Sequence, residues 1–285
     1  MLMTKPEVKL LCDSINPNGQ RLTTFQVKYW RPLLPEMNTH RVFSRNAASS
    51  RAMSFSKRCK QVVEDTVLPT HWNSEKPGMV GGDEFDQETK DFINRKIIQL
   101  AGLTTEFIEQ LNNEVKAKTG YEIHKQYLNR YLEPFTYTTQ IITSTDWDNF
   151  FKLRLAPDAQ PEIRDVALEM FYALNESNPK KLRMGDYHLP YVLPEELEEY
   201  GHFLACKISV ARCARVSYRA YEGHVKLEKD LELFDRLLKS GHMSPFEHVA
   251  VPVETDKHYF NLHGWMSLRY AIETQEPNRG TNFGL

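Results

Sequence analysis

Apolar and polar residues alternate in a few short segments, as they do in a strand with one buried face. Residues 23–30 show the clearest alternation and predict a strand. The β-branched segment 138–143 predicts a second strand, and residues 208–218 are expected to begin as a third. Residues 249–253 predict another strand, in which Pro252 favours an edge or a bulge.

Helical spacing of apolar residues covers more of the chain. The longest amphipathic stripe runs over residues 89–118, with Gly102 as a potential break. The other segments with helical patterns or helix-end signals are 35–55, 123–132, 147–155, 161–174 and 227–240. Gly241 follows the last of these, as a C-terminal cap does. The mixture predicts an α/β or α+β fold in which helices dominate.

Composition places the chain among ordinary soluble proteins. Its 285 residues are 41% hydrophobic and 26% charged, and the formal net charge is −2. Such a surface has no general attraction for nucleic acid, so any anion site must be a local cluster. No apolar run approaches the roughly 20 residues that cross a bilayer, and no leader is recognised, so we expect a cytoplasmic protein without membrane contact.

The cysteines show no metal-binding or redox pattern. They have no CxxC spacing and are expected to be reduced thiols. The four are Cys12, Cys59, Cys206 and Cys213.

A first polar cluster spans residues 39–51. It holds three arginines, one histidine, three serines and one asparagine, without an acid. These groups are the donors that phosphate requires. A solvated basic helix face is the alternative, but the small residues 47–50 favour close approach of a ligand to the backbone.

A second cluster, at residues 240–248, combines a helix end, a Ser-Pro turn and two histidines. His242 and His248 could bind metal together with Glu247, but no third ligand follows at a suitable spacing, so no metal is expected. Histidines satisfied by structural hydrogen bonds remain the alternative.

A third set consists of Arg130 on one predicted helix, and Asn149 and Arg154 on another. An aromatic pair between Asn149 and Arg154 would bury that helix and could hold the guanidinium near a pocket. The alternative is a surface arginine that extends from an amphipathic helix.

Together these blocks resemble the flavin-dependent thymidylate synthases, the thymidylate synthase complementing protein family. That family's signature, Arg-His-Arg followed by seven residues and Ser, is similar to His40, Arg41 and Ser49. Its Gly-His-x-Thr/Ser-Pro-Phe-Glu-His loop matches residues 241–248, and its Asn-Phe-x-x-Leu-Arg motif matches 149–154. Further matches are the Ala-Arg-Val-Ser run at 214–217 and Arg130, which resembles a phosphate-contacting arginine of the family.

The order of the motifs differs from the family. The Ala-Arg-Val-Ser and Gly-His blocks come first there and last here, which implies a circular permutation. Strand–helix units at residues 24–41 and 249–269 both fit the place before the signature. The resemblance implies one flavin-dependent thymidylate synthase-like domain, with a mixed sheet and long helices, over residues 1–285. Its expected parts are a signature and nucleotide-binding part (1–178), a linker (179–205), a permuted His-loop part (206–272) and a tail (273–285).

The resemblance also implies a chemistry. Such enzymes use FAD, NADPH and 5,10-methylenetetrahydrofolate to convert dUMP into dTMP, and they assemble as homotetramers. The resemblance implies that Arg154, which matches the last position of the family's Asn-Phe-x-x-Leu-Arg motif, is the catalytic residue at the uracil edge. The expected substrate-binding residues besides it are Glu36, Ser49, Ser50, Arg51 and Arg130. The expected flavin-binding residues are His40, Arg41, Ser44, Asn46, Asn149, Ser217, His242 and Ser244.

Several positions depart from the family pattern, which leaves the substrate open. Thr39 replaces the first arginine of the signature, and Ala47 stands where the family usually has Glu. Glu36 and Asp158 stand where Gln and His are common. Methylation of UMP or hydroxymethylation at C5 is therefore an alternative. A nucleic-acid-binding module formed by residues 40–58, or a catalytically inactive relative, are the remaining ones.

Overall fold

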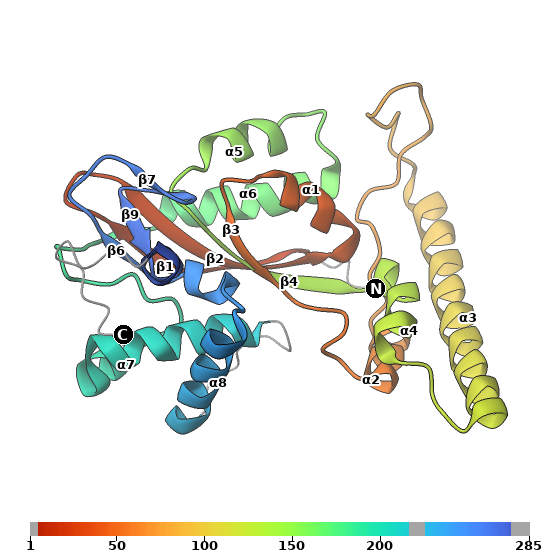
Figure 1. The fold of residues 1–285 in the computed structure, drawn as a ribbon. Coiled ribbons are helices and arrows are strands. Elements are labelled where there is room, and N and C mark those ends of the chain that lie inside the picture. The colour runs from red at the N-terminus through yellow and green to blue at the C-terminus, as the bar shows by residue number, and fades with distance from the viewer. Residues whose placement is uncertain (1–4, 217–225, 275–285) are drawn as a thin grey trace.

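A five-stranded mixed sheet forms the centre of the protein in the computed structural model, which describes residues 5–216 and 226–274. The strand order is β3-β4-β2-β1-β5, and only the β1–β5 pairing is parallel (Figure 1). The strands are β1 (Glu7–Ile15), β2 (Arg21–Trp30), β3 (Ser44–Ala47), β4 (Tyr137–Ser144) and β5 (Lys180–Lys181). The predicted strands at 23–30 and 138–143 are confirmed as β2 and β4.

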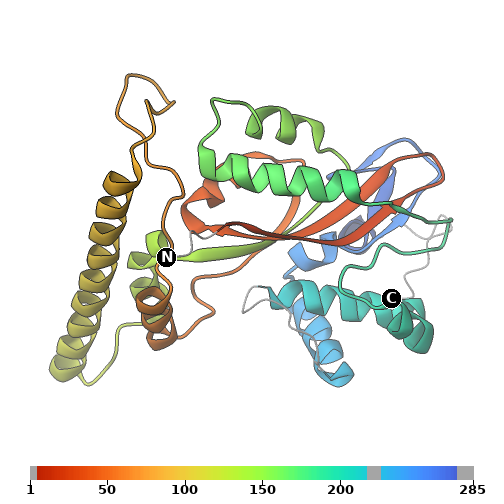
Figure 2. The same cartoon turned by 180° about the vertical axis from the view of Figure 1, so that it is seen from behind.

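Helices cover both faces of this sheet, so the protein is a mixed α/β structure. On one face lie α1 (Leu34–Thr39), α5 (Asp148–Arg154) and α6 (Pro161–Glu176), and on the other lie α7 (Pro194–Arg215) and α8 (Leu227–Ser240) (Figures 1 and 2). Gly241 ends α8 with φ of 70°, a left-handed conformation that glycine adopts without strain, so the predicted cap is confirmed.

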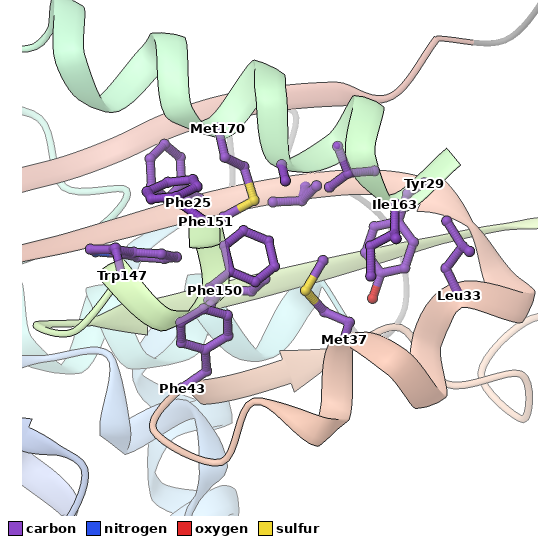
Figure 3. Packing of buried hydrophobic residues seen from close by; sticks show 14 residues of the cluster. Phe25, Tyr29, Leu33, Met37, Phe43, Trp147, Phe150, Phe151, Ile163 and Met170 are labelled. Carbon is purple, nitrogen blue, oxygen red and sulfur yellow. The ribbon is translucent and has the colours of Figure 1, made fainter. Parts of the chain in front are cut away.

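The largest core lies between the sheet and the helices α1, α5 and α6. The alternation in β2 buries Phe25, Val27 and Tyr29 on this side. Phe25 packs edge-on against Trp147 at 5.2 Å between ring centroids, and Phe150 lies beside them (Figure 3). These aromatic contacts fix the position of α5.

A second helical group extends to one side of the sheet. It contains α2 (Phe55–Glu64), the 33-residue α3 (Gln87–Thr119) and α4 (Lys125–Tyr131) (Figure 1). Asp86 caps the start of α3 by accepting from the Thr89 amide. Gly102 does not interrupt the helix, because the backbone stays helical there.

Short elements complete the fold. They are η1 (Arg31–Leu33), η2 (Glu133–Phe135), η3 (Ser244–Glu247), β6 (Ala250–Pro252), β7 (His258–Tyr259), β8 (Leu262–His263), β9 (Trp265–Ser267) and α9 (Leu268–Thr274). Pro252 lies in a two-stranded sheet of β6 and β9, which confirms its edge position. None of the helices in the described part of the chain is both long and apolar enough to cross a membrane.

Two predicted elements are wrong. The helix expected at 35–55 ends at Thr39, and β3 follows because residues 44–47 gain backbone partners on β4. The segment expected to begin as a strand at 208 belongs to α7, which kinks at Gly201. Apolar residues on every side of the later part of α7 are buried, and this removes the amphipathic signal of a helix. α7 also begins inside the expected linker, at Pro194.

Candidate functional site

Two of the recognised motifs meet at the end of α1. Arg154 Nε, on α5, donates a hydrogen bond to His40 Nε2 at 2.9 Å. Arg154 Nη2 also donates to Thr39 Oγ1 at 3.1 Å and to the Glu36 carbonyl at 3.3 Å. Residues 114 positions apart therefore form one polar group (the His40–Arg154 pair).

The electrostatics of this pair keep the imidazole neutral. Burial lowers the pKa of His40 to about 4, and the nearby charges of Arg154 and Arg45 act in the same direction. Because Nε2 accepts from Arg154, the proton of the neutral ring resides on Nδ1. Arg154 is half-buried, and its Nη1 makes no hydrogen bond within the described residues, so that nitrogen is available to a ligand.

Strand β3, which carries part of the family signature, also contacts the His loop (residues 241–248). Asn46 Nδ2, on β3, donates to the Cys213 carbonyl at 2.8 Å, and Ser244 Oγ lies 3.5 Å from Asn46 Oδ1. Burial lowers the pKa of Arg45, and the negative charge of Glu247 raises it in part. Arg269 of α9 donates a hydrogen bond to the Glu247 carboxylate. The amino-terminal and carboxy-terminal motifs thus share one region.

Not every expected site residue joins these contacts. Arg41, Asn149 and His242 are exposed, and His242 pairs with Ser240 Oγ at 2.7 Å. Ser44 is buried at the edge of the sheet. Ser217 lies outside the described residues.

The expected phosphate residues lie near α4, and no hydrogen bond within the described residues joins them to the His40–Arg154 pair. Asn129, the neighbour of Arg130, donates from Nδ2 to the Ser50 carbonyl at 2.7 Å. The loop with Ser49, Ser50 and Arg51 is thereby fixed against the helix that carries Arg130.

A buried polar chain that sequence analysis did not predict crosses the sheet. His188 Nδ1 bonds Ser14 Oγ at 2.9 Å, and its Nε2 bonds Thr24 Oγ1 at 2.8 Å. Thr24 and Thr143 share a 2.7 Å hydrogen bond, and Thr143 Oγ1 lies 2.8 Å from His248 Nδ1. Both histidines are fully buried. His248 is therefore held by one structural hydrogen bond, while its buried Nε2 has no partner within the described residues.

This polar chain was not predictable because its members come from five separate segments. His188 stands alone in a polar segment, and the two threonines have ordinary strand positions. No three His, Cys, Asp or Glu side chains gather as metal ligands within residues 5–216 and 226–274.

The fold and these contacts define a mixed α/β protein with arginine, histidine and serine groups brought together from both ends of the chain. Residues 20–180, more than half of the chain, match the family model described as thymidylate synthase complementing protein. The chain belongs to that family.

Two solved structures illustrate more distant similarity. The UMP/dUMP methylase PolB from Streptomyces cacaoi bound with 5-Br UMP is 17% identical, with a TM-score of 0.45 over 61% of this chain and 90% of that chain. The flavin-dependent thymidylate synthase ThyX from Helicobacter pylori, complexed with FAD and dUMP, is 20% identical, with a TM-score of 0.36 over 54% and 67%. No curated protein sequence matches the chain significantly.

Proposed function

We propose that the protein transfers a one-carbon unit from 5,10-methylenetetrahydrofolate to C5 of dUMP, with FAD as bound cofactor and NADPH as reductant, giving dTMP. The family match supports this function, and the His40–Arg154 pair is the single observation that carries it. Two motifs that the resemblance assigns to one site are in direct contact.

Arg154 is suited to act on the pyrimidine. Its Nη1 is available, while Nε and Nη2 are fixed by His40, Thr39 and the Glu36 carbonyl. A fixed guanidinium in a half-buried place stabilises negative charge that develops on the uracil edge. His40 is a positioning residue here, because its neutral ring accepts from Arg154 without adding a competing charge.

We propose that groups outside this pair bind the rest of the nucleotide. We assign Ser49, Ser50, Arg51 and Arg130 to its phosphate. Glu36 Oε2 is buried and accepts no hydrogen bond within the described chain, so it suits a donor such as a ribose hydroxyl.

The region between β3 and the His loop suits a flavin. Arg41 and His242 offer exposed donors for a pyrophosphate, and Asn46 and Ser244 offer polar contacts for a ring edge. Asn149, Ser44 and Ser217 complete the proposed set. Bound FAD would supply hydride transfer between NADPH and the pyrimidine.

The cysteines support a mechanism without a protein nucleophile. All four are free, and burial raises the pKa of Cys12 to about 11 and that of Cys206 to about 12. Thiols with raised pKa values are poor nucleophiles at neutral pH.

We further propose that the protein is a permuted, cytoplasmic homotetramer. Apolar side chains on one stripe of α3 are exposed, as expected of a surface that another subunit covers. They are Phe92, Leu100, Leu103, Phe107 and Leu111.

A related C5 reaction, on UMP or by hydroxymethylation, is the second candidate. Thr39, which replaces the first arginine of the family signature, accepts a hydrogen bond from Arg154 itself. This change from the family sequence therefore lies in direct contact with the proposed catalytic residue. There it can change which nucleotide the enzyme prefers.

Cofactor uptake distinguishes this proposal from the nucleic-acid-binding alternative. We expect the purified protein to bind FAD and to oxidise NADPH faster when dUMP is present. The measurements are the flavin absorbance of the desalted protein and the rate of NADPH loss. A protein that takes up no flavin and binds oligonucleotides with a steep salt dependence would instead be a nucleic-acid-binding module.

A further inference from the structure

A group of charged side chains lies where α2, η1, α4 and η2 meet, with Arg31 and Arg58 buried and Arg130 exposed. Arg31 Nε is 3.3 Å from Glu133 Oε1, and Arg130 Nη1 is 3.5 Å from the same oxygen. Arg58 lies near both Arg31 and Glu133: burial lowers its pKa, the positive Arg31 lowers it further, and Glu133 offsets part of the shift. We name Arg31, Arg58, Arg130 and Glu133 the arginine cluster.

The arginine cluster has more positive than negative charge. Arg31 and Arg130 share the carboxylate of Glu133, and Arg58 forms no ion pair within the described residues. Arg31 and Arg58 are only 9% and 6% exposed. Buried charge is costly unless it is compensated, and Glu133 compensates only one of these two buried guanidinium groups. The remaining positive charge favours a nearby anion, and it favours a doubly charged anion over a singly charged one.

The loop beside this cluster (residues 48–53) has four of its carbonyl groups occupied by side-chain donors. Three side chains donate to them: Arg31 at 3.1 Å, Asn129 at 2.7 and 3.0 Å, and Lys125 at 3.4 Å. The four carbonyls are those of Ala48, Ser50, Ala52 and Met53.

In the same loop, the amides of Ala48, Arg51 and Ala52 donate hydrogen bonds within the protein. Those of Ser49, Ser50 and Met53 donate to no acceptor in the part of the chain that the structure describes. A short loop with several unused amides is a typical cradle for anion oxygens. The hydroxyl groups of Ser49 and Ser50 add further donors.

We propose that Arg31 and Arg58 make the loop 48–53 selective for a phosphate dianion. The two arginines act as positioning residues: their buried charge, balanced only in part by Glu133, favours the doubly charged form of the ligand over the singly charged form or an uncharged nucleoside. That this phosphate belongs to a pyrimidine nucleotide rests on the proposed function. A phosphate monoester has its second pKa at about 6 and carries nearly two negative charges at neutral pH, so the positive charge of the cluster attracts this form more strongly than the monoanion.

The test compares Arg58→Met with Lys57→Met in the full-length protein. Lys57 is an exposed residue of the same helix and serves as the matched control. Calorimetric titrations with dUMP, deoxyuridine and inorganic phosphate are made at about pH 5.5 and pH 7.5, on either side of the phosphate pKa.

In the wild type we expect tighter dUMP binding at the higher pH. Arg58→Met should weaken dUMP binding at that pH by about tenfold, or about 1.4 kcal/mol, and flatten its pH dependence. Deoxyuridine binding should stay unchanged, and Lys57→Met should behave like the wild type. If the methionine variant does not fold, Arg58→Lys keeps the charge and should keep the pH dependence, with Arg31→Met as the second charge-removing variant.

Different failures have different meanings. If Arg58→Met binds dUMP as tightly as the wild type at both pH values, or loses deoxyuridine to the same extent, the charge-selection proposal is overturned. If neither the wild type nor any variant binds dUMP, but inorganic phosphate binds to the wild type and more weakly to Arg58→Met, the proposed function fails and the anion site stands.

Discussion

Replacing Arg154 by alanine is expected to lower kcat by about 10²–10³-fold while the flavin stays bound. Arg154 is the only charged group that α5 places against His40, at 2.9 Å. Its loss removes the positive charge that we assign to the uracil edge. Most of the proposed flavin contacts lie on β3 and the His loop, so FAD affinity should change little. The measurements are single-turnover product formation and flavin titration.

Two variants separate the charge from the position of Arg154. Arg154→Lys keeps the charge but lacks the planar fork that contacts His40 and the Glu36 carbonyl together, so it should recover only part of the rate. Lys152→Ala, on the exposed face of the same helix, should be as active as the wild type. Normal turnover by Arg154→Ala would refute the assigned role.

Acidification from about pH 6.5 to about pH 3 is expected to destabilise the fold strongly through its buried histidines. Burial lowers the pKa of His188 and of His248 to about 3. The nearby Asp13 raises the pKa of His188 in part, whereas His188 lowers that of His248.

The direction of the effect follows from proton binding. Unfolded histidines become protonated below about pH 6.5, while the buried ones stay neutral down to about pH 3. The unfolded state therefore binds more protons in this window, and the free energy of unfolding falls as the pH falls. Together the two residues should contribute a loss of several kcal/mol, at roughly 1.4 kcal/mol for each pH unit and residue.

Variants of two histidines test this dependence. His188→Gln has no titrating ring, so it should lower stability at neutral pH but show a smaller slope of unfolding free energy against pH. His242→Gln, on an exposed residue, should keep the wild-type slope. Parallel slopes for His188→Gln and the wild type in denaturant titrations would contradict the account.

Elements with a regular period were predictable from the sequence, and those that depend on tertiary pairing were not. The alternation in β2 and the long stripe of α3 appear in the structure as predicted. β3 was missed because its residues read as a continuation of the helix that precedes them, and only the backbone of β4 makes them a strand. α7 was misread because it is buried on several sides and has little amphipathic character.

For the site too, some contacts could be expected before the structure and others could not. Nothing in the spacing of His40 and Arg154 predicts that they touch, and only the family resemblance suggested it. The contact between Asn46 and Ser244 supports the proposed permutation, since it joins motifs that lie 198 positions apart. Arg58 and Glu133 gave no sequence signal, because an isolated arginine or glutamate on a helix is ordinarily solvated.

Product analysis tests the central claim most directly. The protein is incubated with FAD, NADPH and 5,10-methylenetetrahydrofolate deuterated at its methylene carbon, together with dUMP, UMP or dCMP, and the nucleotides are identified by mass spectrometry. The account predicts a deuterium-labelled methyl group at C5 of the uracil nucleotide, formed only when all three cofactors are present. Recovery of every nucleotide unchanged from flavin-loaded protein, with no label at C5, would contradict it.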